Sequence, residues 1–127
     1  LEPILGYLML AERLCEKKEV FADAWNFGPN DEDMKSVGWI VGQLCSRIPE
    51  ASWRTETKQQ PHEAVLLKLD NSKAKVDLGW SPRWNIETAL TKTVEWHQAW
   101  KEKEDLDKLT SMQISEFQGT HNEGRLQ

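Results

Sequence analysis

Apolar residues recur at three- and four-residue steps along much of this chain, and this spacing constrains the fold more than any other feature. The period is that of one face of an α-helix. It predicts helices over 2–17, 37–48 and 86–103, with apolar positions such as Ile4, Leu8, Val41, Leu44 and Leu90. A shorter helix is expected to begin at 70–72 and to end at Gly79, and a last helix is expected over 110–119 with Thr110 and Gln113 as a capping box.

Three short stretches have the composition of β-strands. They cover 24–27, 53–57 and 65–69, and the last alternates best. No strand–helix alternation is long enough for a doubly wound sheet. The sequence therefore predicts a small α+β domain, mostly helical, with a few short strands.

Composition narrows the class of protein. The chain has 127 residues, enough for one compact domain, and a formal charge of −5 with acids and bases interspersed. Nucleic-acid binding needs a clustered basic surface, so no nucleic-acid partner is expected. The sequence has no apolar run that could span a membrane and no charged-then-apolar leader, so we expect no membrane partner and a cytoplasmic location.

The cysteines and tryptophans are expected to be structural. Cys15 and Cys45 lie on predicted apolar helix faces, which indicates reduced, buried thiols; a disulfide is the alternative. Trp80 and Trp84 flank a proline and should hold their turn against the long helix. Trp96 and Trp100 are four residues apart and should stack along that helix.

Motifs for catalysis and for cofactor binding are missing from the sequence. It has no Gly-x-x-Gly-x-x-Gly turn for a dinucleotide, and Tyr7, its one tyrosine, is followed four residues later by Ala11 and not by lysine. The acidic run 31–33 lacks the spacing of a calcium loop. We therefore expect no catalytic residue, no metal site and no bound NAD in this chain.

An ordered series of motifs resembles the closing signature of extended short-chain dehydrogenase/reductases. The motifs are Gln60-Pro61-His62-Glu63-Ala64, Asp70-x-x-Lys73, Leu78-Gly79-Trp80-Ser81-Pro82 and Lys92-Thr93-Val94-Glu95-Trp96. Within that group the series is most similar to the nucleotide-sugar 4,6-dehydratases, over about 1–118. The first motif, together with the stretch Trp25-Asn26-Phe27-Gly28-Pro29-Asn30-Asp31-Glu32-Asp33, resembles the CDP-glucose branch.

The resemblance implies a substrate-binding role. In the family, an N-terminal Rossmann domain holds NAD and the catalytic residues, and the C-terminal part grips the nucleotide and pyrophosphate. His62 matches a histidine near the pyrophosphate, with Glu63 and Gln60 beside it, and Asn30 could meet the nucleotide. Gln60 stands where the dTDP-glucose branch has arginine, so a charged phosphate clamp is not expected there.

The expected organisation is a substrate-binding domain over 1–118 and a frayed tail over 119–127. Because the first residue is Leu1 and a helical pattern begins at once, we expect that an upstream part has been removed, and the resemblance implies that this part is the NAD-binding Rossmann domain. The expected ligand is CDP-glucose or CDP, bound weakly, and the isolated chain should be inactive. The alternatives are a stand-alone helical interaction module, or part of a GDP-mannose or dTDP-glucose dehydratase or of a sugar-nucleotide epimerase.

Overall fold

The structure is a computed structural model that describes residues 1–55 and 69–123. Its helices are α1 (Glu2–Glu16), α2 (Lys18–Phe21), α3 (Val37–Arg47), α4 (Ile86–Glu102) and α5 (Leu106–Glu123), with a 3-10 turn η1 (Asp31–Asp33) and a wide π-type turn η2 (Ala74–Leu78). No strand is present among the described residues.

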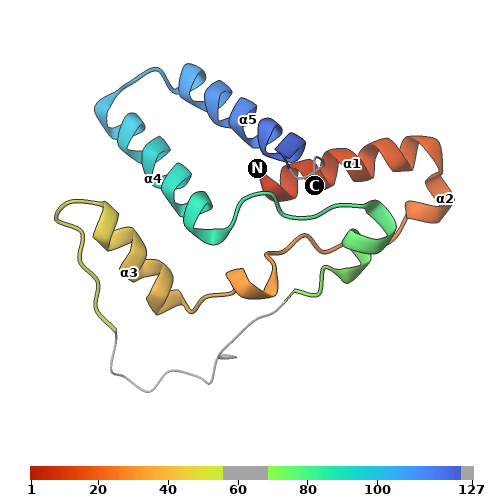
Figure 1. The fold of residues 1–127 in the computed structure, drawn as a ribbon, viewed down its shortest axis with the longest axis horizontal. Coiled ribbons are helices and arrows are strands. Elements are labelled where there is room, and N and C mark those ends of the chain that lie inside the picture. The colour runs from red at the N-terminus through yellow and green to blue at the C-terminus, as the bar shows by residue number, and fades with distance from the viewer. Residues whose placement is uncertain (56–68, 124–127) are drawn as a thin grey trace.

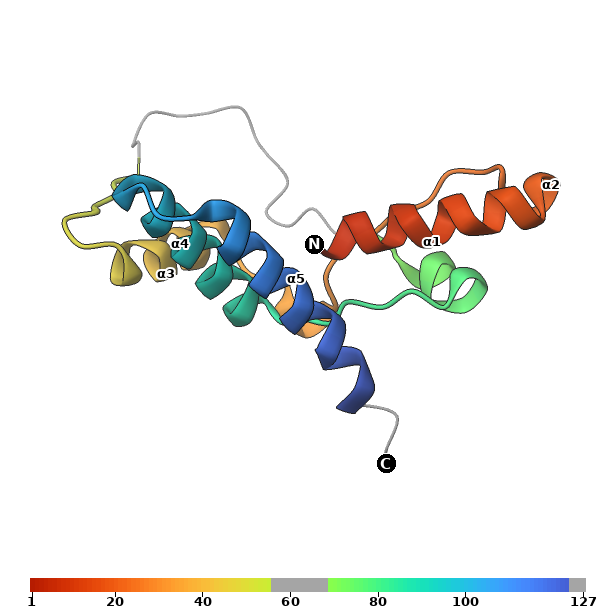
Figure 2. The same ribbon diagram turned by 90° about the horizontal axis from the view of Figure 1, so that it is seen from above.

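The helices form two groups that meet near the start of α1. In Figure 1, α4 and α5 run antiparallel as a hairpin with α3 beside α4, while α1 extends away with η2 beneath it. The view from above shows the same division (Figure 2). Long segments without helix join the two groups: 22–30, which leads from α2 to η1, and 79–85, which leads from η2 to α4.

One core lies between α1 and η2. Trp80 is 1% exposed and packs with Ala74 and Leu78, and partly buried apolar residues surround them: Leu5, Met9, Leu10, Phe21, Trp25 and Phe27. The rings of Phe27 and Trp80 meet edge to face at 5.1 Å. Burial of this aromatic area is the main stabilising contribution that this half of the molecule offers.

The second core lies along α4. This helix buries Leu90, Val94 and Ala99, and α5 buries Phe117. A charged contact joins the two helices, because Lys92 Nζ lies 2.8 Å from Glu116 and 3.3 Å from Glu95. The hydrogen bond to Glu116 is the main cause that raises the pKa of Lys92 above its ordinary 10.5, with Glu95 adding to it and burial opposing it.

The predicted strands are not found, so the α+β class is wrong for the described residues. Residues 24–27 are extended, but their side chains pack on other elements: Trp25 stacks on Phe21 and Phe27 meets Trp80. The aromatic composition of 24–27 thus reflects this packing and not a β-sheet. Residues 53–55 are exposed and form no strand, and 65–68 lie outside the described residues.

Helix ends were predicted well where a local side chain caps them. Ser36 Oγ accepts from the Trp39 amide, Asn85 Oδ1 accepts from the Thr88 amide, and Gly79 ends η2 with a φ of 71°. The capping box at Thr110 is wrong, because α5 already begins at Leu106 and Asp105 Oδ1 accepts from the Lys108 amide.

Three further predictions need correction. The end predicted near Gly119 is wrong, since α5 continues to Glu123; residues 124–127 are outside the described part. Trp80 lies against α1 and Trp84 against Phe117 of α5, so these helices also hold the turn, while Trp84 borders a hollow that Ala89 and Trp96 of α4 line. Both cysteines are free, but Cys15 is exposed and Cys45 half-buried, contrary to the predicted burial.

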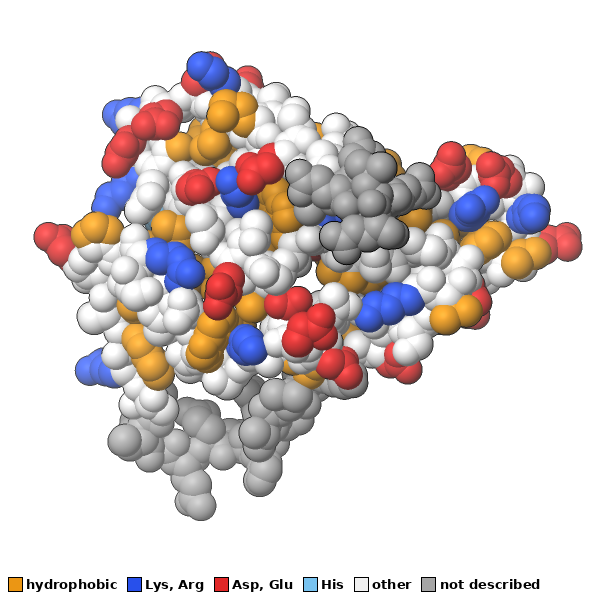
Figure 3. Space-filling model, in the orientation of Figure 1, with side chains coloured by type: hydrophobic (Ala, Val, Ile, Leu, Met, Phe, Trp, Pro, Cys, Tyr) orange, Lys and Arg blue, Asp and Glu red, His pale blue; other side chains and the backbone are white. Residues whose placement is uncertain are grey.

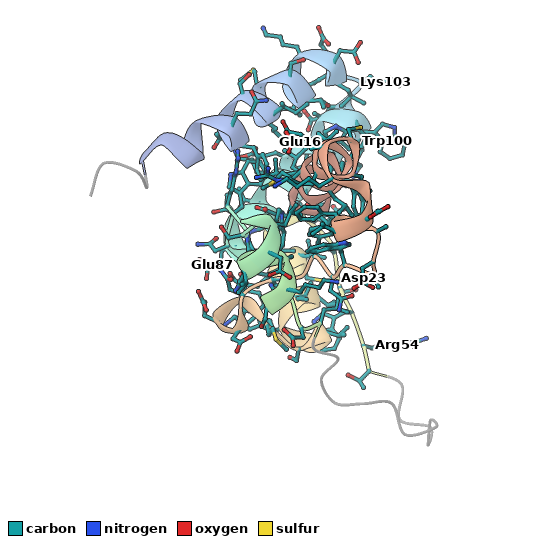
Figure 4. The ribbon with its side chains drawn as sticks, turned by 90° about the vertical axis from the view of Figure 1, so that its right-hand side faces the viewer. Glu16, Asp23, Arg54, Glu87, Trp100 and Lys103 are labelled. Carbon is teal, nitrogen blue, oxygen red and sulfur yellow. The ribbon has the colours of Figure 1, made fainter. Side chains whose placement is uncertain are left out.

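The aromatic residues late in α4 also differ from the prediction. Trp96 Nε1 donates to Thr110 Oγ1 of α5 at 3.1 Å, and the Trp100 ring contacts His97 at 5.6 Å. Figure 4 shows Trp100 on the outside of the molecule near Lys103, where α4 ends. Each tryptophan thus has its own contact.

Among the described residues, no helix combines the length and the apolar character that crossing a bilayer requires.

Candidate functional site

Two segments far apart in sequence are joined by side-chain amides. Asn71 is buried, and its Nδ2 donates to the carbonyls of Gly28 at 2.8 Å and Pro29 at 3.1 Å. In the other direction, Asn26 Nδ2 donates to the Asp70 carbonyl at 3.2 Å. These bonds satisfy backbone groups that no sheet pairs, and they fix the loop 26–30 against the turn that carries η2.

Asn30 stands at the end of that loop and contacts the same turn. Lys75 Nζ donates to Asn30 Oδ1 at 2.8 Å. Lys75 follows Asn71 by one helical turn, and its backbone amide donates to the Asn71 carbonyl at 3.1 Å. The two residues of the turn that hold the loop therefore lie on one side of it.

An open polar hollow of about 740 Å³ lies between these segments. It is lined by Asn30, Asp31, Glu32, Asp70, Asn71, Ser72 and Lys75. Amide and ammonium groups supply donors, and the carboxylates supply acceptors for hydroxyl groups. This polar hollow can hold a hydroxyl-rich ligand with carbonyl or phosphate oxygens.

The acidic run 31–33 separates into two roles. Asp31 and Glu32 line the polar hollow, whereas Asp33 is buried and its Oδ1 accepts from the Ile86 amide at 2.9 Å. A carboxylate at a helix N-terminus is favoured by the helix dipole, so Asp33 positions α4 relative to the loop. Within residues 1–55 and 69–123, no three His, Cys, Asp or Glu side chains are grouped as a metal site requires.

Glu2 organises the turn that leads into α4. Its Oε1 accepts from the backbone amides of Arg83 at 3.0 Å and Trp84 at 2.7 Å, and its carbonyl accepts from Trp80 Nε1 at 3.2 Å. Its Oε2 is buried and has no hydrogen-bond partner within the described part of the chain. An apolar cavity of about 240 Å³ adjoins this turn and is lined in part by Phe27, Trp80 and Trp84.

Charged groups elsewhere on the surface form local pairs. Lys73 Nζ donates to Asp23 and to the Ala24 carbonyl, and lies 4.4 Å from the centre of the Trp25 ring. Figure 4 places Asp23 on the loop beside the turn that carries η2. The bond from Lys73 is the main cause that lowers the pKa of Asp23 below its ordinary 3.8, and the Ala24 amide adds to it. Lysines, arginines and acids are interspersed on the face shown in Figure 3.

Of the four residues predicted for substrate binding, the structure describes Asn30, which lies in the polar hollow. Gln60, His62 and Glu63 lie outside the described residues, so their placement stays a prediction. Sequence reasoning missed Lys75 and the bridging role of Asn71. Their four-residue spacing at the start of a short helix was the available signal, but it does not reveal a partner more than 40 residues away.

The comparisons with known proteins give two relatives. No family model matches the chain. It is 43% identical over 118 residues to the CDP-glucose 4,6-dehydratase of Salmonella typhimurium strain LT2, which covers 92% of this chain and 33% of that protein. It is 30% identical over 90 residues to the dTDP-glucose 4,6-dehydratase of Escherichia coli, covering 63% of this chain and 25% of that protein. The chain thus spans a third or less of the length of these relatives.

Proposed function

Because the chain belongs to the nucleotide-sugar 4,6-dehydratase family and matches its C-terminal part, we propose that it is the substrate-binding portion of a dehydratase acting on CDP-glucose. The observation that carries the proposal is Asn30 in the polar hollow, fixed by Asn71 and Lys75, in the stretch whose sequence resembles the CDP-glucose branch. The higher identity to the CDP-glucose relative than to the dTDP-glucose relative also supports a preference for CDP-glucose.

In this proposal the polar hollow receives part of the nucleotide sugar. The Asn30 amide donates to ligand oxygens, while the carboxylates of the hollow accept from ligand hydroxyls. Gln60, His62 and Glu63 complete the site near the pyrophosphate, where an imidazole N–H can donate to phosphate oxygens. Donors from several segments must converge to bind a diphosphate, and this chain supplies a part of them.

The chemistry of the whole enzyme belongs to the rest of a longer protein. The family resemblance implies oxidation of the sugar at C4 by NAD, loss of water across C5 and C6, and reduction at C6 by the NADH so formed. Among the described helices, α3 and α4 begin behind Ser36 and Asn85 and not behind a glycine-rich turn, so neither helix start fits that cofactor. The proposed role of this chain is to bind and orient the substrate.

An apolar face on α1 supports the proposal that the domain packs against such a partner. Ile4, Tyr7 and Leu8 are 55%, 60% and 64% exposed. Ile4 and Leu8 also line an apolar groove of about 290 Å³ with Ile114 and Phe117 of α5. Contiguous exposed apolar surface of this kind marks interaction sites. We propose that the NAD-binding domain of a complete dehydratase covers this face.

Titration of the purified chain with CDP-glucose tests the proposal. Association has an entropic cost that few contacts must offset, so we expect a dissociation constant on the order of 1 mM or weaker, roughly −4 kcal/mol. NMR should show the Asn30 and His62 signals shifting with CDP-glucose, and less with dTDP-glucose as the matched control. No shift at any residue would contradict the binding role, and micromolar affinity would contradict the incomplete site. Turnover of CDP-glucose by this chain would contradict its predicted inactivity.

A further inference from the structure

We infer that Lys75 is a positioning residue, which holds the Asn30 side-chain amide with both of its N–H donors directed at a bound ligand. The inference rests on the proposed nucleotide-sugar function and adds a residue to its site. The ligand group that this arrangement selects is an oxygen acceptor of the nucleotide sugar, because an amide NH₂ group can only donate.

The first observation is that Asn30 does not do what asparagine usually does at its position. It directly precedes η1 with extended backbone angles, where an asparagine oxygen commonly accepts from a backbone amide two or three residues later. Its side chain makes no such bond. The oxygen accepts from Lys75 Nζ at 2.8 Å instead, so a contact across the polar hollow replaces the local cap.

The second observation concerns the direction of the amide. A lysine ammonium can only donate, so the atom that faces Lys75 must be the oxygen. The amide is planar, and its NH₂ group therefore lies on the side away from Lys75. In the described part of the chain that NH₂ group makes no hydrogen bond, which leaves both donors for a ligand in the polar hollow.

The third observation is that the buried Asn71 fixes the backbone at both Asn30 and Lys75. Asn71, which is 8% exposed, holds the carbonyls of Gly28 and Pro29 directly before Asn30. The same residue accepts the backbone amide of Lys75. The separation of Asn30 and Lys75 is thus set by the fold, and the amide is oriented before a ligand arrives. Such preorganisation lowers the entropic cost of binding.

The chemistry of the amide sets the kind of ligand group that Asn30 can bind. An NH₂ group can only donate, so its partner is an oxygen acceptor. A nucleotide sugar offers two such groups, the ring carbonyl of its base and the oxygens of its diphosphate.

The test uses ¹H–¹⁵N NMR spectra of the 127-residue chain and of three variants, Lys75→Met, Lys75→Arg and Lys101→Met. Lys101 is an exposed lysine in the last turn of α4 and serves as the matched control. Without ligand, Lys75→Met should move the Asn30 side-chain NH₂ signals, whereas Lys75→Arg should largely retain them and Lys101→Met should leave them unchanged. Unmoved signals in Lys75→Met overturn the positioning role.

With ligand, Lys75→Met should weaken CDP binding about fivefold, the size expected for one oriented hydrogen bond. Lys75→Arg should bind within about twofold of the original chain, since its guanidinium still donates. Cytidine alone and pyrophosphate alone distinguish the two acceptors, since the one that Asn30 binds should shift the Asn30 NH₂ signals; no shift with either, although CDP binds, would overturn the role of Asn30. The ligand-free comparison does not depend on the proposed function, whose own failure would appear as no response of the original chain to CDP-glucose.

Discussion

The ring of Phe27 lies directly against the backbone of Gly6, so closely that a Cβ atom on Gly6 would be 2.4 Å from Cδ1 of the ring. Two other rings also hold Phe27, since Tyr7 and Trp80 meet it edge to face at 5.5 and 5.1 Å. Residue 6 therefore needs to lack a side chain for α1 to approach the segment that leads to Asn30.

Gly6→Ala should destabilise the protein although it improves helix propensity. Alanine gains up to about 1 kcal/mol over glycine inside a helix, but forcing an extra methyl group into an enclosed contact costs about 1–3 kcal/mol. The clash should outweigh the gain in propensity, because the Phe27 ring can move away from Gly6 only by giving up its contacts with Tyr7 and Trp80. Urea denaturation would measure this loss.

Gly42→Ala is the matched control. Gly42 lies inside α3, and an added Cβ there would meet nothing within 4 Å. The substitution should therefore raise the free energy of unfolding by about 0.5–1 kcal/mol. Equal stabilisation by both substitutions would contradict the close packing of Phe27 on α1.

Glu2→Ala should destabilise the protein strongly, because Glu2 holds the turn that leads into α4. It removes the acceptor for the amides of Arg83 and Trp84, and bonds to a charged acceptor contribute about 1.5–3 kcal/mol each. We expect a loss of about 2–3 kcal/mol in thermal or urea unfolding, because the two bonds are only partly buried and water can replace part of them.

Two variants separate this role from a general effect of charge. Glu2→Gln keeps an oxygen for both amides and should retain most of the stability. Glu12→Ala removes an exposed acid from the same helix and should stay within about 0.5 kcal/mol of the original protein. If Glu2→Ala behaves like Glu12→Ala, the bonds to the turn contribute nothing measurable.

The ion pair of Asp23 and Lys73 predicts that the stability of the protein depends on pH in the acidic range. The folded state lowers the pKa of Asp23, so its contribution is complete above the ordinary value of 3.8 and disappears as the pH falls through the lower folded value. The melting temperatures of the original protein and of Asp23→Asn should differ slightly and constantly at neutral pH, and should converge in acid. The effect is small because both side chains are well exposed. A difference in melting temperature that grows as the pH falls would contradict the lowered pKa of Asp23.

The parts of the fold that depend on neighbours in sequence could be predicted. Ser36, Asn85 and Gly79 end helices through bonds to residues within a turn or through their own backbone angles. The aromatic composition of 24–27 favoured a strand, but its structure depended on whether another segment paired with it. Whether such an aromatic segment joins a sheet or packs on a helix is decided by distant residues.

The candidate site shows the same limit. Asn30 was found through resemblance, whereas Lys75 contacts it across 45 positions of sequence and Asp33 reaches Ile86 across 53. Nothing in the local pattern distinguishes Lys75 from the exposed lysines of α4. Such bridges follow from the way in which the two groups of helices are joined.

The start of α5 has two candidate caps, because the sequence predicts Thr110 and the structure shows Asp105. Asp105 Oδ1 accepts from the Lys108 amide at 3.0 Å, and the Asp105 carbonyl accepts from Leu109. Thr110 lies inside the helix and accepts from Trp96 Nε1, which is partly exposed and can turn to water. Asp105→Ala should therefore lose about 1 kcal/mol in urea unfolding, as expected for a lost N-cap that also favours the helix dipole. Thr110→Ala should lose less than about 0.5 kcal/mol. Asp105→Asn, which can still accept, should fall close to the original protein. If Thr110→Ala proves the more damaging change, α5 begins later than Leu106 and the capping box read from the sequence is correct after all.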